Sequence, residues 1–443
     1  MGIKTEDIMK FQSIIKFSVE FLNSRENLKD LKLYKKKHLV GSAMPNIELI
    51  SAAGAYPVFP IRMYHFGDAS VAKSLSLGKS ILGDGLLSNL IQFAGKLDRT
   101  KTVDTVIRSL IDGIFTRYDQ MYRIGVDECG VPEDECYGIK ILCGMYHSKG
   151  KNLSATFHQT IRCSAWQKTY ETWTNYAPGI FLEIPPFDGE LVKELATAEV
   201  KHAAVELSKI TGIEITNERL RRVTEITNEC KDLSIRIIEI ALGDYLPIHP
   251  VSMAQLLSLI EICFHDYLSN PKKFRDLLRD IVKEMDYALE HSTSLFDARD
   301  YKKIFFTVRF GGWEHLVEDF VFEHKGRIIY ADWFLYGFMN KIKTTGDMFE
   351  NYADYLIKLI CQFGANNKEV IKEVVDFVSD NDIDGLIYNQ LFGCHSVSTA
   401  YNRLRRDLLE LDIPSTMINF TNVGDNLQQT KTRCTALMEI LHA

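Results

Sequence analysis

Two segments of the chain, one in each half, alternate short apolar runs with a helical stretch, and this alternation restricts the possible folds more than any other feature. In the first, a strand-like run at 38–40 precedes a predicted helix at 46–52 and a second apolar run at 56–61. In the second, strand-like runs at 302–309 and 327–330 flank a predicted helix at 313–323. This order is typical of parallel α/β units, so we predict a parallel sheet in each half.

The region between the two units has a different pattern. Residues 189–298 show helical periodicity and almost no strand signal, which predicts a bundle of long helices. We therefore expect an α/β fold with two Rossmann-like parallel-sheet domains, a substantial helical segment between them and an N-terminal helix. The expected boundaries are 1–37 for the N-terminal helical segment, 38–188 for the first α/β domain, 189–298 for the helical segment and 299–443 for the second α/β domain.

The charge balance and the hydropathy exclude some classes of protein. The net charge is −7 over 443 residues, whereas a nucleic-acid-binding protein needs a basic face. No stretch approaches the ~18 apolar residues that span a bilayer, and the N-terminus lacks the apolar core of a secretory signal. We expect a cytoplasmic protein that binds neither nucleic acid nor membranes.

Nine cysteines are spread along the chain. An odd number in a long chain without a secretory signal argues against a disulfide framework. Each cysteine is therefore expected to be either a small buried hydrophobic residue or a metal ligand. Four of them lie in helical stretches among apolar neighbours and are expected to be structural: Cys230, Cys263, Cys361 and Cys434.

Three features closely follow predicted strands, namely Cys163, the Gly311-Gly312 turn and Cys394. Open α/β sheets bind their ligands beyond the carboxyl ends of the strands. We therefore predict that these residues lie at the functional edges of their sheets.

Three longer segments carry a resemblance to known proteins. The first is PNIELISAAGAYPV at 45–58, and the second is the block 302–332, with its Gly-Gly turn and the return strand GRIIYAD. The third is DGLIYNQLFGC at 384–394, followed by a T-R-x-x-A-x-x-E pattern at 432–439. Together they resemble the 2-hydroxyacyl-CoA dehydratase and benzoyl-CoA reductase family, over about residues 38–443 with a poorly matched middle.

The resemblance implies that the chain binds a 4Fe–4S cluster through three cysteines. Cys163 matches the second ligand, at the end of a strand, and Cys394 matches the third. The first ligand most resembles Cys136, while Cys143 and Cys129 are the alternatives for that position.

Three thiolate ligands leave one iron of such a cluster open, so that it can act as a Lewis acid. The resemblance implies that a separate ATP-dependent iron–sulfur activator supplies one electron and that a ketyl radical forms at the thioester carbonyl and expels the 2-hydroxyl group. The expected function is the dehydration of an (R)-2-hydroxyacyl-CoA to an enoyl-CoA. The acyl-CoA substrate, the activator and a related second subunit are the expected partners of this oxygen-sensitive enzyme.

Three other functions are compatible with the same residues. The chain can be a subunit of an ATP-dependent aryl-CoA reductase of the benzoyl-CoA type, or a non-catalytic subunit whose cluster relays electrons. The relay role is favoured by Ser164, which stands where the family has an aspartate. A binding protein of α/β fold without any cluster is the last alternative.

Five further residues are candidates for the site. Glu48 matches a family glutamate and is a candidate base, and Ser42 in the loop before it can hydrogen-bond a hydroxyl group or water. His395 follows a candidate ligand and can donate to a cluster sulfide. Gly311 and Gly312 can bind the CoA phosphates at a helix N-terminus. The structural alternatives are a first-turn acid favoured by the helix dipole, an ordinary histidine and a tight turn.

Overall fold

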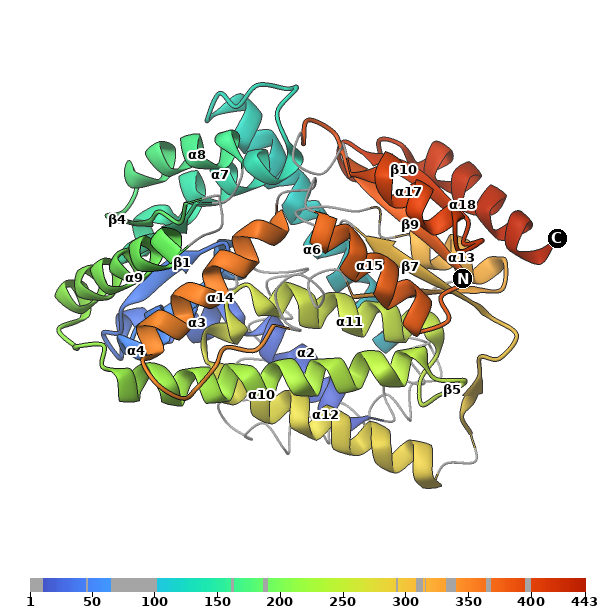
Figure 1. Ribbon diagram of the computed structural model, residues 1–443, viewed down its shortest axis with the longest axis horizontal. Coiled ribbons are helices and arrows are strands. Elements are labelled where there is room, and N and C mark those ends of the chain that lie inside the picture. The colour runs from blue at the N-terminus through green and yellow to red at the C-terminus, as the bar shows by residue number, and fades with distance from the viewer. Residues whose placement is uncertain are drawn as a thin grey trace.

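The computed structural model confirms an α/β protein with two parallel sheets and a helical region between them (Figure 1). No helix in the described part of the chain is long and apolar enough to cross a membrane. The structure describes residues 11–44, 47–64, 102–160, 163–185, 190–291, 294–307, 314, 316–331, 340–363, 368–394 and 400–443.

The first sheet has four parallel strands in the order β2-β1-β3-β4. Its strands are β1 (Leu39–Ser42), β2 (Tyr56–Val58), β3 (Ala155–Gln159) and β4 (Gly179–Leu182). Helix α4 (Glu48–Ala52) connects β1 with β2, as predicted. Leu39 and Val40, which are successive residues of β1, enter two different apolar cores, so both faces of this sheet are covered, which is typical of parallel sheets.

The second sheet also has four parallel strands, in the order β10-β9-β7-β8. Its strands are β7 (Lys302–Thr307), β8 (Gly326–Tyr330), β9 (Gly385–Leu391) and β10 (Ser415–Phe420). Helix α13 (Val317–Glu323) lies between β7 and β8 in the sequence, which confirms the predicted strand–helix–strand unit.

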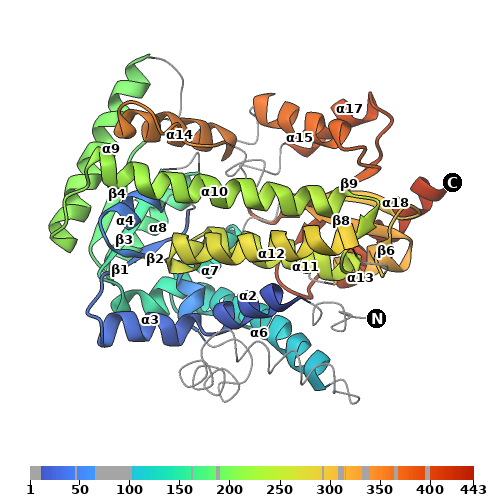
Figure 2. The ribbon, with the colours of Figure 1, turned by 90° about the horizontal axis from the view of Figure 1, so that it is seen from below.

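Long helices connect the two sheets, as the periodicity of the middle region predicts. They are α9 (Glu190–Thr211), α10 (Asn217–Leu242), α11 (Pro250–Phe264) and α12 (Pro271–His291). Figure 2 shows α10 and α12 running side by side across the molecule. From residue 11 on, the N-terminal segment forms the helices α2 (Gln12–Leu22) and α3 (Ser24–Leu33), which are separated at Asn23.

One helix of the C-terminal half packs on the first sheet. Helix α14 (Met348–Phe363) follows β8 in the chain, but it lies beside α9 (Figure 1). Its buried residues, including Tyr352 and Leu356, share an apolar core with Val40 of β1 and Leu49 of α4. The surroundings of α4 are therefore completed by a segment that is remote in sequence.

Candidate functional site

The carboxyl edge of the first sheet carries three of the predicted site residues. Ser42 is the last residue of β1, and Glu48 opens α4 shortly after it. Cys163 follows the neighbouring strand β3 and is the residue immediately before α8 (Ser164–Thr174). The three residues therefore lie at the carboxyl edge of the first sheet, next to strands that the sequence predicts.

Cys394 follows β9 of the second sheet, and its thiol is hydrogen-bonded to the thiol of Cys136. Cys136 immediately precedes α7 (Tyr137–Lys149), and its sulfur also accepts hydrogen bonds from the backbone N–H groups of Gly138 and Ile139. The neighbouring thiol and burial raise the pKa of Cys136 well above its usual value. Metal binding at this pair would displace thiol protons.

The two thiols meet because the backbones that carry them are in close contact. Gly393 has a φ of +74°, and a Cβ atom there would lie 2.4 Å from the carbonyl oxygen of Asp134 and 2.6 Å from the carbonyl carbon of Glu135. Only glycine accommodates both the left-handed conformation and this approach. The turn after β9 is thereby held against the loop before α7.

Further contacts hold the two halves together around the thiol pair. The ring of Tyr137 packs edge-on against Phe420 at the end of β10, with ring centroids 4.9 Å apart. Asn422 donates a hydrogen bond of 2.6 Å to Asp119 on α6 (Thr102–Asp127). The thiol pair therefore lies in an interface made by α6, α7 and the carboxyl edge of the second sheet.

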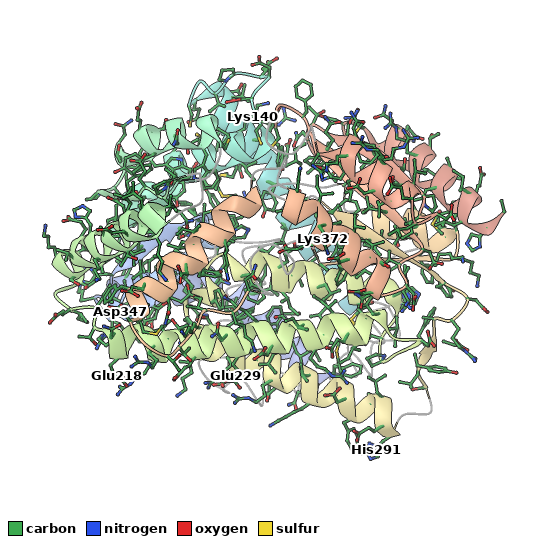
Figure 3. All side chains as sticks on the ribbon, in the orientation of Figure 1. Lys140, Glu218, Glu229, His291, Asp347 and Lys372 are labelled. Atoms are coloured by element: carbon green, nitrogen blue, oxygen red, sulfur yellow. The ribbon has the colours of Figure 1, made fainter. Side chains whose placement is uncertain are left out.

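A buried lysine lies close to Cys136. Lys140, on the first turn of α7 (Figure 3), donates hydrogen bonds to the carbonyl oxygen of Glu133 and to the hydroxyl group of Tyr122. Burial lowers the pKa of Lys140. A positive charge here would favour a thiolate at Cys136.

The alternatives for the first ligand position lie elsewhere. Cys143 is buried within α7, and burial raises its pKa to about 12. The charge of Cys129 raises the pKa of Cys143 further, and burial raises the pKa of Cys129 itself to about 11. Of the three alternatives, Cys136 is the one whose thiol contacts Cys394.

Cys163 lies at the start of a helix next to the one that Cys136 precedes. Among the residues that the structure describes, no three His, Cys, Asp or Glu side chains form a metal-binding group. Cys163 is half-buried at the start of α8, a helix that packs against α7. Two of the three predicted ligands are therefore in contact, and the third begins an adjacent helix.

The candidate base is deeply buried. Glu48 is 0% exposed, and its Oε2 accepts a hydrogen bond of 3.3 Å from the hydroxyl group of Tyr352. The hydroxyl group of Ser42 is also buried, and it donates to the carbonyl oxygen of Met44 at 2.9 Å. Ser42 therefore fixes its own loop in this structure. The remaining candidates, Gly311, Gly312 and His395, lie outside the described residues.

Three buried residues around Glu48 were not identified from the sequence. They are Lys231 of α10, Tyr352 of α14 and Tyr267, which follows α11. In a helix with many charged residues, the periodicity of the sequence does not distinguish a buried lysine from a solvent-exposed lysine. Nothing in the local pattern indicates that these side chains approach α4.

Comparison with known proteins identifies the family to which the chain belongs. The family described as "2-hydroxyglutaryl-CoA dehydratase, D-component" matches residues 43–441, which is nearly the whole chain. No curated protein matches. A D-component is one part of a dehydratase system and implies a partner subunit. The chain therefore belongs to the 2-hydroxyglutaryl-CoA dehydratase D-component family.

Proposed function

We propose that this chain is a subunit of an oxygen-sensitive 4Fe–4S enzyme that dehydrates an (R)-2-hydroxyacyl-CoA to an enoyl-CoA. In this proposal a related second subunit and an ATP-dependent iron–sulfur activator are its partners in the cytoplasm. The observation that carries the proposal is the contact between the thiols of Cys136 and Cys394, which two distant parts of the chain bring together. Membership of a dehydratase family supports the same reaction class.

Three residues would hold the cluster in this proposal, namely Cys136, Cys163 and Cys394. When bound, a cluster with three thiolate ligands supplies an open iron as a Lewis acid and a centre for one-electron transfer. The fit is partial, because among the described residues no three metal-ligating side chains form a metal-binding group. The position of Cys163 immediately before a helix that packs on α7 supports its part in the ligand set.

The chain's other candidates have roles around this centre. Glu48 would accept the β-proton of the substrate through a carboxylate oxygen, and Ser42 would stabilise the loop that precedes it. Gly311 and Gly312 would bind the CoA phosphates, and His395 would donate to a cluster sulfide. The burial of Glu48 supports its role, because a water-excluded carboxylate is a stronger base toward a bound substrate.

Anaerobic purification with iron and sulfide counting tests this proposal. We expect about four irons per chain in the wild type and a loss of iron in Cys136→Ala, Cys163→Ala and Cys394→Ala. Cys143→Ala is the matched control, because it removes a buried thiol from the same helix that Cys136 precedes. Little iron in the wild type, or full iron in the three variants, would refute the ligand assignment.

An assay of the protein with its cluster bound then distinguishes a dehydratase from a reductase. With the second subunit and the activator present, (R)-2-hydroxyglutaryl-CoA should lose water without net consumption of electrons. An aryl-CoA reductase would instead consume reductant in proportion to the product that it forms.

A further inference from the structure

A group of polar side chains is buried around Glu48. Lys231, Tyr267 and Tyr352 join Glu48 from three helical segments, and each of the four is 0% exposed. Helix α4 packs against α10, which in turn packs against α14, and the turn that carries Tyr267 packs against β2. Burying a carboxylate and an ammonium group in this way is costly unless their polar atoms have partners.

The hydrogen bonds of this group are incomplete. Oε2 of Glu48 is bonded to Tyr352, but Oε1 has no hydrogen-bond partner among the described residues, and neither has the hydroxyl group of Tyr267. The ammonium group of Lys231 donates to the carbonyl oxygen of Asn340 at 3.2 Å and lies 4.3 Å from the ring centroid of Tyr355. Two buried polar atoms are thus left for a ligand.

Tyr267 is held in place by an unusual turn. Tyr267, Leu268 and Ser269 have φ values of 48°, 54° and 58°, three consecutive left-handed residues that are not glycine. Such a conformation is costly and persists only where the surroundings enforce it.

The surroundings that enforce this turn centre on the residue before it. The buried carboxylate of Asp266 accepts hydrogen bonds from the backbone N–H of Phe59 at 2.9 Å and from Ser269 at 3.4 Å. It also forms an ion pair of 3.2 Å with Arg62. The ring of Tyr267 packs edge-on against Phe264. The turn therefore fixes the direction of the Tyr267 side chain.

Glu48 and Tyr267 also interact electrostatically. Burial, and next the negative charge of Glu48, raise the pKa of Tyr267 well above its usual value. The charge of Glu48 likewise favours the protonated form of Lys231. The charge of Glu48 therefore acts on both of these buried side chains.

The chemistry of the unused atoms selects the class of ligand. A carboxylate oxygen only accepts hydrogen bonds, whereas a phenolic hydroxyl group donates and accepts. A group that joins them must donate to Glu48 and accept from Tyr267, as a hydroxyl group does. An anionic ligand is disfavoured by the charge of Glu48.

We propose that Glu48 Oε1 and Tyr267 Oη bind a hydroxyl group in this buried site, either the 2-hydroxyl group of the substrate or a water molecule. Tyr352 and Lys231 are positioning residues in this arrangement, because they act through Glu48. The assignment of the substrate hydroxyl group rests on the function proposed above, whereas the hydroxyl-binding site itself does not.

Tyr267→Phe tests the site, and Tyr146→Phe is its matched control. Tyr146 is also fully buried, and its hydroxyl group has no hydrogen-bond partner among the described residues, but it lies in the aromatic cluster with Trp173. Binding of (R)-2-hydroxyglutaryl-CoA and of glutaryl-CoA to the full chain is measured by calorimetry without activator. If the substrate is the source of the hydroxyl group, Tyr267→Phe weakens binding of the hydroxylated thioester about tenfold and leaves the other unchanged.

Urea unfolding of the ligand-free chain tests whether a water molecule supplies the hydroxyl group. If a water molecule bridges the two atoms, Tyr267→Phe lowers the urea midpoint, whereas Tyr146→Phe leaves it unchanged. The inference is overturned if Tyr267→Phe behaves like Tyr146→Phe in both experiments. If the inference fails in this way but the wild type contains its full iron, the proposed dehydratase function still stands. If Tyr267→Phe lowers the urea midpoint but the wild type contains no iron, only the hydroxyl-binding site stands.

Discussion

Lys231 is a charged side chain in a position that water does not reach. Its ammonium group donates to the carbonyl oxygen of Asn340 and lies over the face of the Tyr355 ring. Burial lowers its pKa from 10.5 to about 8, against the opposing influence of Glu48. The pKa of Lys231 therefore depends on the polarity of the site around Glu48.

The stability of the protein should depend on pH through this residue. Between about pH 8 and 10.5 the unfolded chain binds a proton at Lys231 that the folded chain does not, so the free energy of unfolding rises with pH. The rise expected from this group is about 3 kcal/mol at most. Urea unfolding across this range should show the rise in the wild type and lose that part of it in Lys231→Met.

Other groups near Lys231 titrate or carry charge, namely Glu48, Cys230, Asp232 and Lys341, so only the difference between variant and wild type is informative. Lys372→Met is the matched control, because Lys372 is exposed on α15 (Lys368–Asp380; Figure 3). Identical pH profiles for Lys231→Met and the wild type would contradict the buried, shifted lysine.

At the scale of elements, the crossing of α6 and α7 places Cys136 in the interface. The two helices approach so closely that a Cβ atom on Gly144 would lie 2.0 Å from the carbonyl oxygen of Met121, and one on Gly125 would lie 2.1 Å from that of Lys140. Glycine inside a helix costs roughly 1 kcal/mol relative to alanine. Here that cost permits contact between the two backbones.

Gly144→Ala should therefore be destabilising despite the better helix propensity of alanine. The added methyl group forces the helices apart, and we expect a loss of about 2–4 kcal/mol in the free energy of unfolding. Chemical denaturation measures this loss. Gly243→Ala is the control, because its nearest contact would be 3.3 Å, and it should cost under about 1 kcal/mol. Equal effects of the two substitutions would show that the crossing tolerates a side chain.

At the scale of the whole molecule, the two halves meet where the turn after β9 touches the loop before α7. This contact brings Cys394 to Cys136 and depends on Gly393. Gly393→Ala adds a methyl group that would collide with the backbone at Asp134 and Glu135. We expect the two thiols to separate and a short thiol-bridging reagent to join them several-fold less in the variant than in the wild type.

Gly424→Ala separates this collision from simple backbone strain. Gly424 also has a positive φ, of 82°, but no atom of the described part of the chain lies within 4 Å of the position that a Cβ atom would take there. It should reduce stability without reducing the bridging of Cys136 and Cys394, as mass spectrometry of the bridged peptides would record. Undiminished bridging in Gly393→Ala would contradict the proposed closeness of the two backbones.

The sequence by itself determined the parts of this protein that local patterns encode. The alternation around 38–61 and 302–330 predicted the β1–α4–β2 and β7–α13–β8 units, and the middle helices followed from their periodicity, because an apolar repeat records which face of a segment is buried. Family motifs identified Cys136, Cys163, Cys394 and Glu48 as candidates, and their roles stay predictions.

Only the tertiary structure decided which of these residues meet. It brought Cys136, rather than Cys129 or Cys143, to Cys394, and it packed α14 on the first sheet so that Tyr352 reaches Glu48. Contacts between remote segments depend on how whole elements pack, and they leave no periodic signal in either segment. The buried charge of Lys231 was hidden for the same reason, because a helix pattern shows a polar position without showing what covers it.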